Sequence, residues 1–322
     1  MKRHIRQFTA IAGLTALEAV RQPICLLMAT TCVVFIGLLP FLITHTLGEG
    51  AKLVRDSGLA FHFVCGLILG SYAACSSLTH EIRRGTAASI LSKPVSREIF
   101  FLAKFAGVAM VMLLFSAAAG MAVLMSTRVA EPLYSFDWWS AIPLLAAPLM
   151  AYTIAGLWNF FTQRPFVSAA SFLLLVTMAA AFVSAGWVDA EGHRVAFGSA
   201  YSWKIVPVSV LIFLAIAVLT GLAMSLAIRL DTVPTLSICS VVFLIGLMSD
   251  YLFGRHAAHS LFADLLYRVI PNWQHFWVVD ALSGPGAIPW SYVARVALYA
   301  GLYLAGILSL GMLAFRQLEV RA

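Results

Sequence analysis

The sequence predicts an all-α fold, a polytopic bundle of about eight transmembrane helices (six to eight), and three observations carry that prediction. Hydrophobic residues make up 61% of the 322-residue chain, and charged residues only 11%. Soluble domains are about 45–50% apolar and about 25% charged, so a water-soluble fold could not hide this much apolar surface. The apolar residues also fall in long runs, and a run of about 20 is enough to cross a bilayer. These features exclude soluble, disordered, collagen-like and disulfide-scaffold proteins.

The first 22 residues predict an amphipathic helix that lies in the membrane interface. Ile11, Leu14 and Leu17 recur at helical spacing, and charged residues interrupt the run between them and the first long apolar stretch. A signal peptide needs an uninterrupted apolar core and a small-residue cleavage site, which this segment does not have. A helix with one apolar face lies along the membrane surface instead. Pro23 is expected to separate it from the first span.

Eight apolar runs follow, and each is expected to form one span, because their length separates them from strands. They lie at about 24–44, 59–79, 101–125, 140–160, 166–187, 205–228, 232–253 and 291–315. Basic residues concentrate around the first three spans on the side that holds the N-terminus, which predicts a cytoplasmic N-terminus. Eight spans return the C-terminus to the same side. The tight connections at 164–165 and 229–231 are the places where this count would fall if a helix were broken.

The whole chain, 1–322, is interpreted as one membrane-spanning domain with no soluble appendage. The five cysteines all lie in apolar runs and form no CxxC pair, so they are expected to be buried apolar side chains rather than disulfides or metal ligands. The net charge of +7 is explained by the basic residues that flank spans. No basic stripe interleaves with aromatic residues, and no nucleic-acid partner is expected.

The basic stretch 80–100, between the second and third expected spans, stands out as a candidate docking segment. It contains a Glu-x-x-x-Gly-Thr pattern, then Leu-Ser-Lys-Pro-Val-Ser-Arg, and the next span opens with Lys-Phe-x-Gly. A short amphipathic helix is expected from Thr86 to Leu91, and Pro94 would end it. On charge alone, an ordinary solvated loop on the positive side of the membrane is the favoured interpretation.

The order of these residues resembles the membrane subunit of type-2, exporter-class ATP-binding-cassette (ABC) transporters. In that family this segment includes the coupling helix, which docks into a groove on the nucleotide-binding subunit. The resemblance implies that the docking positions here are Glu81, Gly85, Thr86, Leu91, Pro94 and Arg97. The first 22 residues are similar to the family's interfacial elbow helix, and 254–290 to its external segment before the last span. Many members have six spans, so the middle of this chain departs from the family pattern.

The resemblance implies that the single domain, 1–322, is the permease of an ATP-driven exporter in the inner (plasma) membrane. If ATP powers this protein, a separate subunit is expected to bind it. A P-loop needs lysine after glycine, and no lysine here follows a glycine. No catalytic residue, metal or cofactor is therefore expected on this chain, and ATP and Mg²⁺ belong to a partner. The expected partners are an ABC ATPase subunit, a second permease in a homodimer or heterodimer, and membrane lipid. The scarcity of carboxylates in the spans disfavours proton- or sodium-coupled transport.

Two other functions remain open at this point. The chain could be a non-transporting membrane anchor or assembly subunit that recruits a soluble partner through the same segment. It could also be an acyltransferase-like membrane enzyme, because His259 with Asp264 and His275 with Asp280 each form an HxxxxD pair. Such a pair can orient a histidine as a general base. The tryptophans near these residues favour interfacial anchoring instead.

Overall fold

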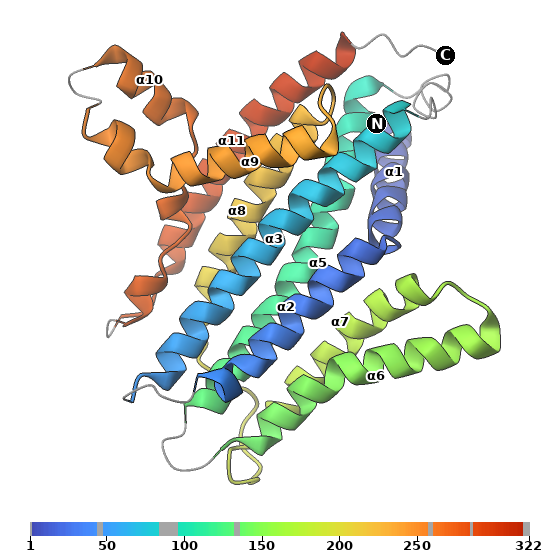
Figure 1. The fold of residues 1–322 in the computed structure, drawn as a ribbon, viewed down its shortest axis with the longest axis vertical. Helices are drawn as coiled ribbons and strands as arrows, with labels where there is room; N and C mark the ends of the chain where they lie inside the picture. The colour runs from blue at the N-terminus through green and yellow to red at the C-terminus, as the bar shows by residue number, and fades with distance from the viewer. Residues whose placement is uncertain are drawn as a thin grey trace.

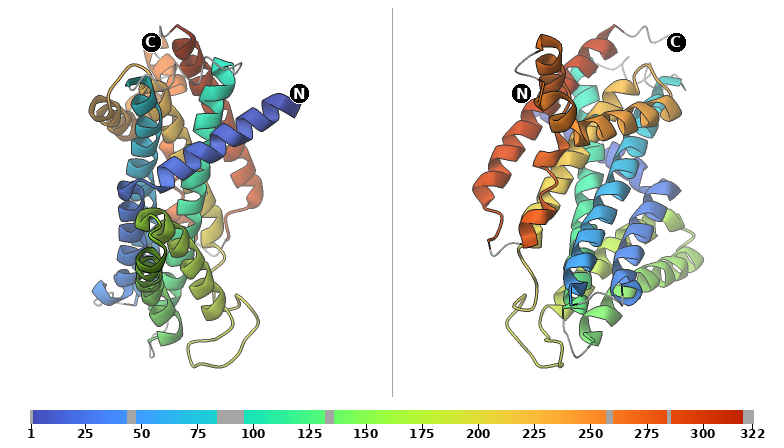
Figure 2. Two further views of the ribbon diagram at one scale, coloured as in Figure 1. Left: turned by 90° about the vertical axis from the view of Figure 1, so that its right-hand side faces the viewer. Right: turned by 60° about the vertical axis from the view of Figure 1, so that its left-hand side comes forward.

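The computed structural model shows an elongated bundle of helices (Figures 1 and 2). It describes residues 2–43, 48–83, 96–131, 136–256, 260–283 and 286–317. Across these ranges there is no β-strand, only an isolated bridge between Val188 and Arg194. The all-α prediction is confirmed.

Seven of the described helices are long and apolar enough to cross a membrane. This number falls within the predicted six to eight. The seven helices are α2 (Pro23–Leu42), α3 (Gly50–Arg83), α5 (Arg97–Ala130), α6 (Trp138–Thr162), α7 (Phe166–Ala185), α8 (Ile205–Leu226) and α11 (Trp290–Arg316).

Helices α3, α5 and α8 form the centre of the bundle. Their apolar windows are the most buried of the seven, whereas those of α7 and α11 are the least buried. Side chains such as Leu69 of α3, Met112 of α5 and Ile216 of α8 are fully enclosed in one continuous core. The outer helices expose large apolar side chains, as lipid-facing helices do.

Helix α1 (Lys2–Val20) begins and α11 ends at the same end of the bundle, which we call the termini end (Figure 1). The opposite end, which holds the start of α6 and the loop 186–204, is called the far end. Helices α3 and α5 contain 34 residues each, or about 50 Å at about 1.5 Å per residue. A bilayer core is about 30 Å thick, so both helices are longer than a span requires.

Helix α1 is the helix expected in the first 22 residues, and it crosses the bundle obliquely (Figure 2, left). Thr15 and Ala19 are buried against the other helices, while Leu14 and Leu17 are exposed. Arg21 and Gln22 connect α1 to α2. Pro23 is the first residue of α2, a position where proline is tolerated.

The eighth span expected at 232–253 is not one continuous helix. Helix α9 (Thr232–Leu247) has 16 residues and is followed by a π-helical turn, η1 (Asp250–Gly254). The chain then forms α10 (Leu261–Val269) and two 3₁₀ turns, η2 (Trp273–His275) and η3 (Val279–Ser283), before α11. Short elements therefore connect the end of α8 to the start of α11, where one spanning helix was expected.

A close contact explains why α9 stops where it does. A Cβ atom at Gly246 would collide with the carbonyl oxygen of Pro271 and lie 2.5 Å from Trp273. Trp273 is fully buried, and its indole nitrogen donates to the carbonyl oxygen of Val242 at 3.4 Å. Asp250 then accepts hydrogen bonds from Tyr267 and from Asn272. The chain after α10 thus packs over the end of α9, a contact that apolar periodicity does not reveal.

The two tight connections identified in the sequence both join separate helices. Helix α6 ends at Thr162 and α7 begins at Phe166, with Gln163 in the left-handed conformation at φ 56°. Helix α8 ends at Leu226 and α9 begins at Thr232. In Figure 1 the α6–α7 hairpin leans away from the bundle at its turn.

Candidate partner-docking site

The candidate docking segment connects the termini ends of α3 and α5. Glu81 lies in the last turn of α3, and Arg97 is the first residue of α5. Gly85, Thr86, Leu91 and Pro94 lie outside the described residues, as does the short helix expected between them. The roles predicted for these six residues therefore stay predictions. The described helices around the segment show what it is attached to.

The first turn of α5 is fastened to the last turn of α11. Arg97 Nη1 donates to the carbonyl oxygen of Arg316 at 2.8 Å. Arg316 in turn pairs with Glu98, with Nε donating to Oε1 at 2.7 Å. Beneath these bonds, the Phe100 and Phe315 rings stack with centroids 5.9 Å apart. The end of the last span therefore moves with the start of α5.

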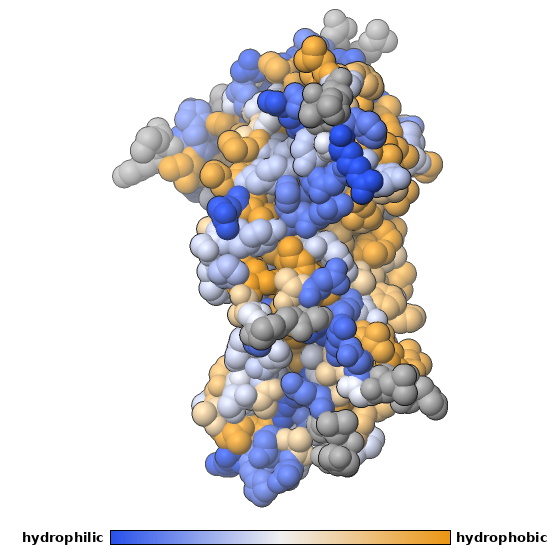
Figure 3. Space-filling view, turned by 90° about the vertical axis from the view of Figure 1, so that its left-hand side faces the viewer, coloured by the Kyte–Doolittle hydropathy of each residue, from blue (hydrophilic) through white to orange (hydrophobic). Residues whose placement is uncertain are grey.

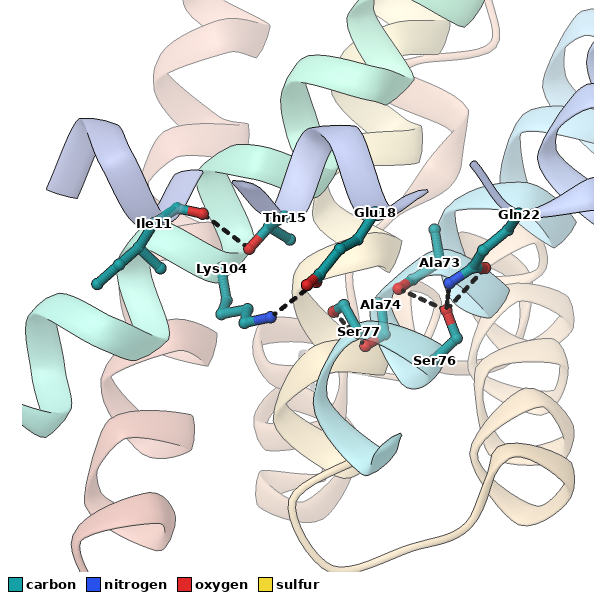
Figure 4. A network of polar contacts seen from close by, with 9 residues as sticks. All are labelled: Ile11, Thr15, Glu18, Gln22, Ala73, Ala74, Ser76, Ser77 and Lys104. Atoms are coloured by element: carbon teal, nitrogen blue, oxygen red, sulfur yellow. Dashed lines mark hydrogen bonds and ion pairs between the residues drawn. The ribbon is translucent and has the colours of Figure 1, made fainter. Parts of the chain in front are cut away.

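One turn deeper, α1 is fastened to α5 by charge (Figure 4). Lys104 Nζ lies 3.4 Å from Glu18 Oε2. The Lys104 side chain is only 2% exposed, while that of Glu18 is 44% exposed. A lysine is this deeply buried only when it has a partner, and the pair therefore fixes where α1 crosses α5.

A glycine lets α1 reach α5 at this crossing. A Cβ atom at Gly107 would lie 2.5 Å from the carbonyl oxygen of Ala12 and 2.7 Å from Thr15 Cβ. No side chain fits there, because the nearest atom belongs to the backbone. Small residues allow close helix crossings in membranes in this way. The Lys-Phe-x-Gly sequence that opens the span thus supplies a charge and a close contact for the same helix.

The corner between α1 and α2 is tied to α3 as well. The Gln22 amide and the Ser76 hydroxyl lie within hydrogen-bonding distance, 2.8 Å from the amide nitrogen and 3.0 Å from the amide oxygen (Figure 4). Helices α3, α5, α11 and α1 are thus joined to one another at the two ends of the candidate segment. A force applied to the segment would reach all four helices through these contacts.

The far end holds a second polar cluster, which the sequence interpretation missed. Arg128 of α5 pairs with Asp137 at 2.7 Å, and both side chains are buried, at 4% and 0% exposure. Arg128 also donates to the carbonyl oxygens of Ala185 at 2.6 Å and Val188 at 2.5 Å. Asp137 caps α6 by accepting from the backbone nitrogen of Ser140 at 3.1 Å. An acidic residue just before Trp138 is a cap pattern that could have indicated this role.

Tyr201 completes the far-end cluster. The Arg128 guanidinium lies over its ring, 5.5 Å from the centroid, and its hydroxyl donates to the carbonyl oxygen of Phe182 at 2.7 Å. Burial raises the pKa of Tyr201 to about 12, although Arg128 acts in the opposite direction. The loop 186–204 is therefore held against α5 by a charge, a hydrogen bond and an aromatic ring.

Among the described residues proposed for an enzyme, Asp264, His275 and Asp280, no assembled site is formed. Asp264 pairs with Arg268 at 3.0 Å, and the ring of His275 packs edge-on against Tyr299. Between His275 and Asp280, both of which the structure describes, there is no hydrogen bond or ion pair. His259 lies outside the described residues. No group of three or more His, Cys, Asp or Glu side chains is placed to hold a metal in the described ranges.

Comparison with protein families identifies a relationship that comparison with individual proteins does not. No curated protein and no solved structure matches the chain. A family model described as "ABC-2 family transporter protein" matches residues 25–230. The matched part runs from the start of α2 to the connection after α8, so it includes the candidate docking segment and the Lys104–Gly107 sequence. The chain is a multi-pass membrane protein that belongs to the ABC-2 transporter family.

Proposed function

We propose that this chain is the permease subunit of an ATP-driven exporter and that a separate ABC ATPase docks on the segment between α3 and α5. The observation that carries the proposal is the joining of α1, α3, α5 and α11 around that segment. ABC-2 family membrane proteins generally work with an ABC ATPase subunit. A docked partner would move four helices at once here, because ion pairs, stacked rings and a glycine contact connect them.

The proposed orientation places the termini end in the cytoplasm of a cell whose inner membrane holds the protein. The ATPase is soluble and cytoplasmic in this scheme, so its docking segment must face that side. The excess length of α3 and α5 supports this, because about 20 Å of each helix can extend beyond the bilayer core. Basic residues near the same end also follow the positive-inside tendency.

A second permease subunit, identical or related, would complete the transport path. Polar side chains exposed along the α10–α11 side support a protein neighbour there, and they include Arg255, Arg268 and Arg295. Figure 3 shows hydrophilic residues across the middle of that face as well as at its two ends. Charged groups that face lipid are costly, so such residues favour a wet or protein-covered surface.

The test is to purify the chain from its native membrane in mild detergent and identify what accompanies it. The wild type should bring down a P-loop ATPase, and the double variant Glu81→Ala with Gly85→Pro should lose it. Glu49→Ala is the matched control, because Glu49 is an exposed glutamate at the opposite end of α3. The control should retain the ATPase.

Two other outcomes would change the proposal. If no ATPase accompanies the wild type under conditions that preserve complexes, the docking hypothesis fails. If the ATPase binds through the segment but ATP drives no export in reconstituted vesicles, the chain is a membrane anchor that recruits the ATPase without transporting.

A further inference from the structure

An apolar cavity of about 440 Å³ lies below the C-terminal part of α1. Residues 16–20 of α1 form its roof, and α2, α3, α5 and α7 supply its walls. It extends from Val111 to Ala118 along α5 and from Ser168 to Leu175 along α7. Each of these stretches is about 10 Å long, so the cavity is elongated parallel to the spans.

The wall of the cavity suits hydrocarbon. Apart from the Cys25 thiol, its polar side chains among the described lining residues are Ser168 and Ser171. Ser168 donates to the carbonyl oxygen of Pro165 at 3.2 Å. Ser171 donates to the carbonyl oxygens of Val167 at 2.9 Å and Val20 at 3.2 Å. Both hydroxyls are thus engaged by the protein, and a polar ligand would find little to bind inside.

The cavity opens on the outer surface of the bundle. Leu17 of α1, Leu114 of α5 and Phe172 of α7 line it and are also exposed. These three residues mark a mouth between three helices, on a part of the molecule where the surrounding medium is the membrane. In Figure 1 the start of α7 lies beside the corner between α1 and α2, as the Ser171–Val20 hydrogen bond requires. An acyl chain can therefore enter sideways and lie along the helices.

Positive charge stands at the roof end of this mouth. Arg21 directly follows Val20, which lines the cavity, and Arg164 lies in the connection before α7, four residues before the lining residue Ser168. Both arginines are exposed. They lie at the two chain connections that frame the upper end of the cavity, where a lipid headgroup would lie if its chain hung below. Guanidinium groups bind phosphate with paired hydrogen bonds.

We propose that this cavity binds an anionic phospholipid, with one acyl chain between α5 and α7 and the phosphate between Arg21 and Arg164. The inference does not depend on the ATPase, because the cavity and both arginines belong to this chain alone. The bound lipid would fill the gap between the α6–α7 hairpin and the central helices. It would also support the C-terminal part of α1 from below, next to the contact of α1 with Gly107.

The test uses the full chain reconstituted in phosphatidylcholine vesicles that contain a trace of photoreactive phospholipid with its reactive group on the acyl chain. A phosphatidylglycerol probe should label the peptides around Leu17, Leu114 and Phe172 several-fold more than a phosphatidylcholine probe. The double variant Arg21→Ala with Arg164→Ala should remove that preference. Arg229→Ala is the matched control, because Arg229 is an exposed arginine at another helix connection and does not neighbour the cavity.

A second variant tests the hydrocarbon part separately. Ala118→Trp places a large ring in the cavity and should reduce labelling by either probe several-fold, while Leu149→Trp on the exposed face of α6 should not. Inorganic phosphate should not compete with the lipid probe. Equal labelling by both probes would overturn the proposal. So would unchanged labelling in both the Arg21→Ala with Arg164→Ala variant and the Ala118→Trp variant. If Phe172 instead cross-links to a second copy of the chain and is not labelled by lipid, the mouth is a protein contact and the proposal fails.

Discussion

Helix α5 carries a buried cation near each of its ends, and the two are held differently. Lys104, at the termini end, pairs at 3.4 Å with a glutamate that is 44% exposed. Arg128, at the far end, pairs at 2.7 Å with a fully buried aspartate and also binds two carbonyl oxygens. The separation of the two residues along the helix is about 36 Å. Both partners of the far-end pair are thus buried, whereas one partner of the termini-end pair remains in contact with solvent.

This difference shows which charge pair is costlier to lose. Removing the cation at the far end would leave a carboxylate buried without a partner, whereas removing it at the termini end would leave a carboxylate that solvent hydrates. The far-end cluster therefore acts as a fixed point for the loop 186–204, while the α1–α5 crossing depends less on its charge pair. A docking partner is proposed at the end whose charge pair is less costly to lose.

The largest expected effect is that of Arg128→Ala. It leaves the Asp137 carboxylate buried without its cation, and breaking a buried pair in this way costs about 3–5 kcal/mol. Denaturant unfolding in detergent should show this loss. Arg194→Ala is the control, because Arg194 is an exposed arginine in the same loop. A loss of unfolding free energy below about 1 kcal/mol would show that the buried pair does not hold the far end together.

Gly107→Ala comes next. The new methyl group would meet the Ala12 carbonyl oxygen, so α1 must move away from α5, and overpacking of this kind costs about 1–3 kcal/mol. Gly13→Ala, on α1 itself, is the matched control, because a Cβ atom there meets nothing within 4 Å. The thermal unfolding midpoint should fall for the first variant only. Equal midpoints would mean that the close crossing does not hold α1.

Tyr201→Phe tests the far-end cluster through the pH dependence of its contribution to stability. The variant loses one hydrogen bond, which is worth about 0.5–1.5 kcal/mol at neutral pH. The pKa of Tyr201 is raised to about 12 in the folded chain, against about 10 when unfolded. Protonated Tyr201 therefore stabilises the fold below pH 10, and this contribution is lost as pH rises toward 12. The stability difference between wild type and variant should shrink across that window, and a constant difference would contradict the assignment.

Lys104→Met should have the smallest effect on stability, within about 1 kcal/mol. Methionine fills the buried site, and Glu18 remains hydrated. The same unfolding measurement, with Lys52→Met as a control at an exposed pair, tests this. If Lys104→Met costs as much as Arg128→Ala, the two ends are equally fixed and the comparison fails.

The sequence predicted the helical class, the long spans and the first helix, because composition and run length depend on each segment alone. It also placed Lys104 and Gly107 in a motif, although it gave no reason for them. It missed the shortening of α9, which depends on Trp273 packing against Gly246 from a distant part of the chain. It missed Arg128 with Asp137 for the same reason: neither residue shows its partner until the helices are assembled.

The position of Gly107 along α5 has a mechanical consequence. If the Arg128 cluster is the fixed point, the arm from it to Arg97 is about 46 Å and the arm to Gly107 is about 32 Å. A rigid α5 then swings about its far end. A displacement applied at Arg97 reaches the crossing with α1 at about two thirds of its size, so a stroke at one face of the membrane moves α1 nearly as far as the start of α5.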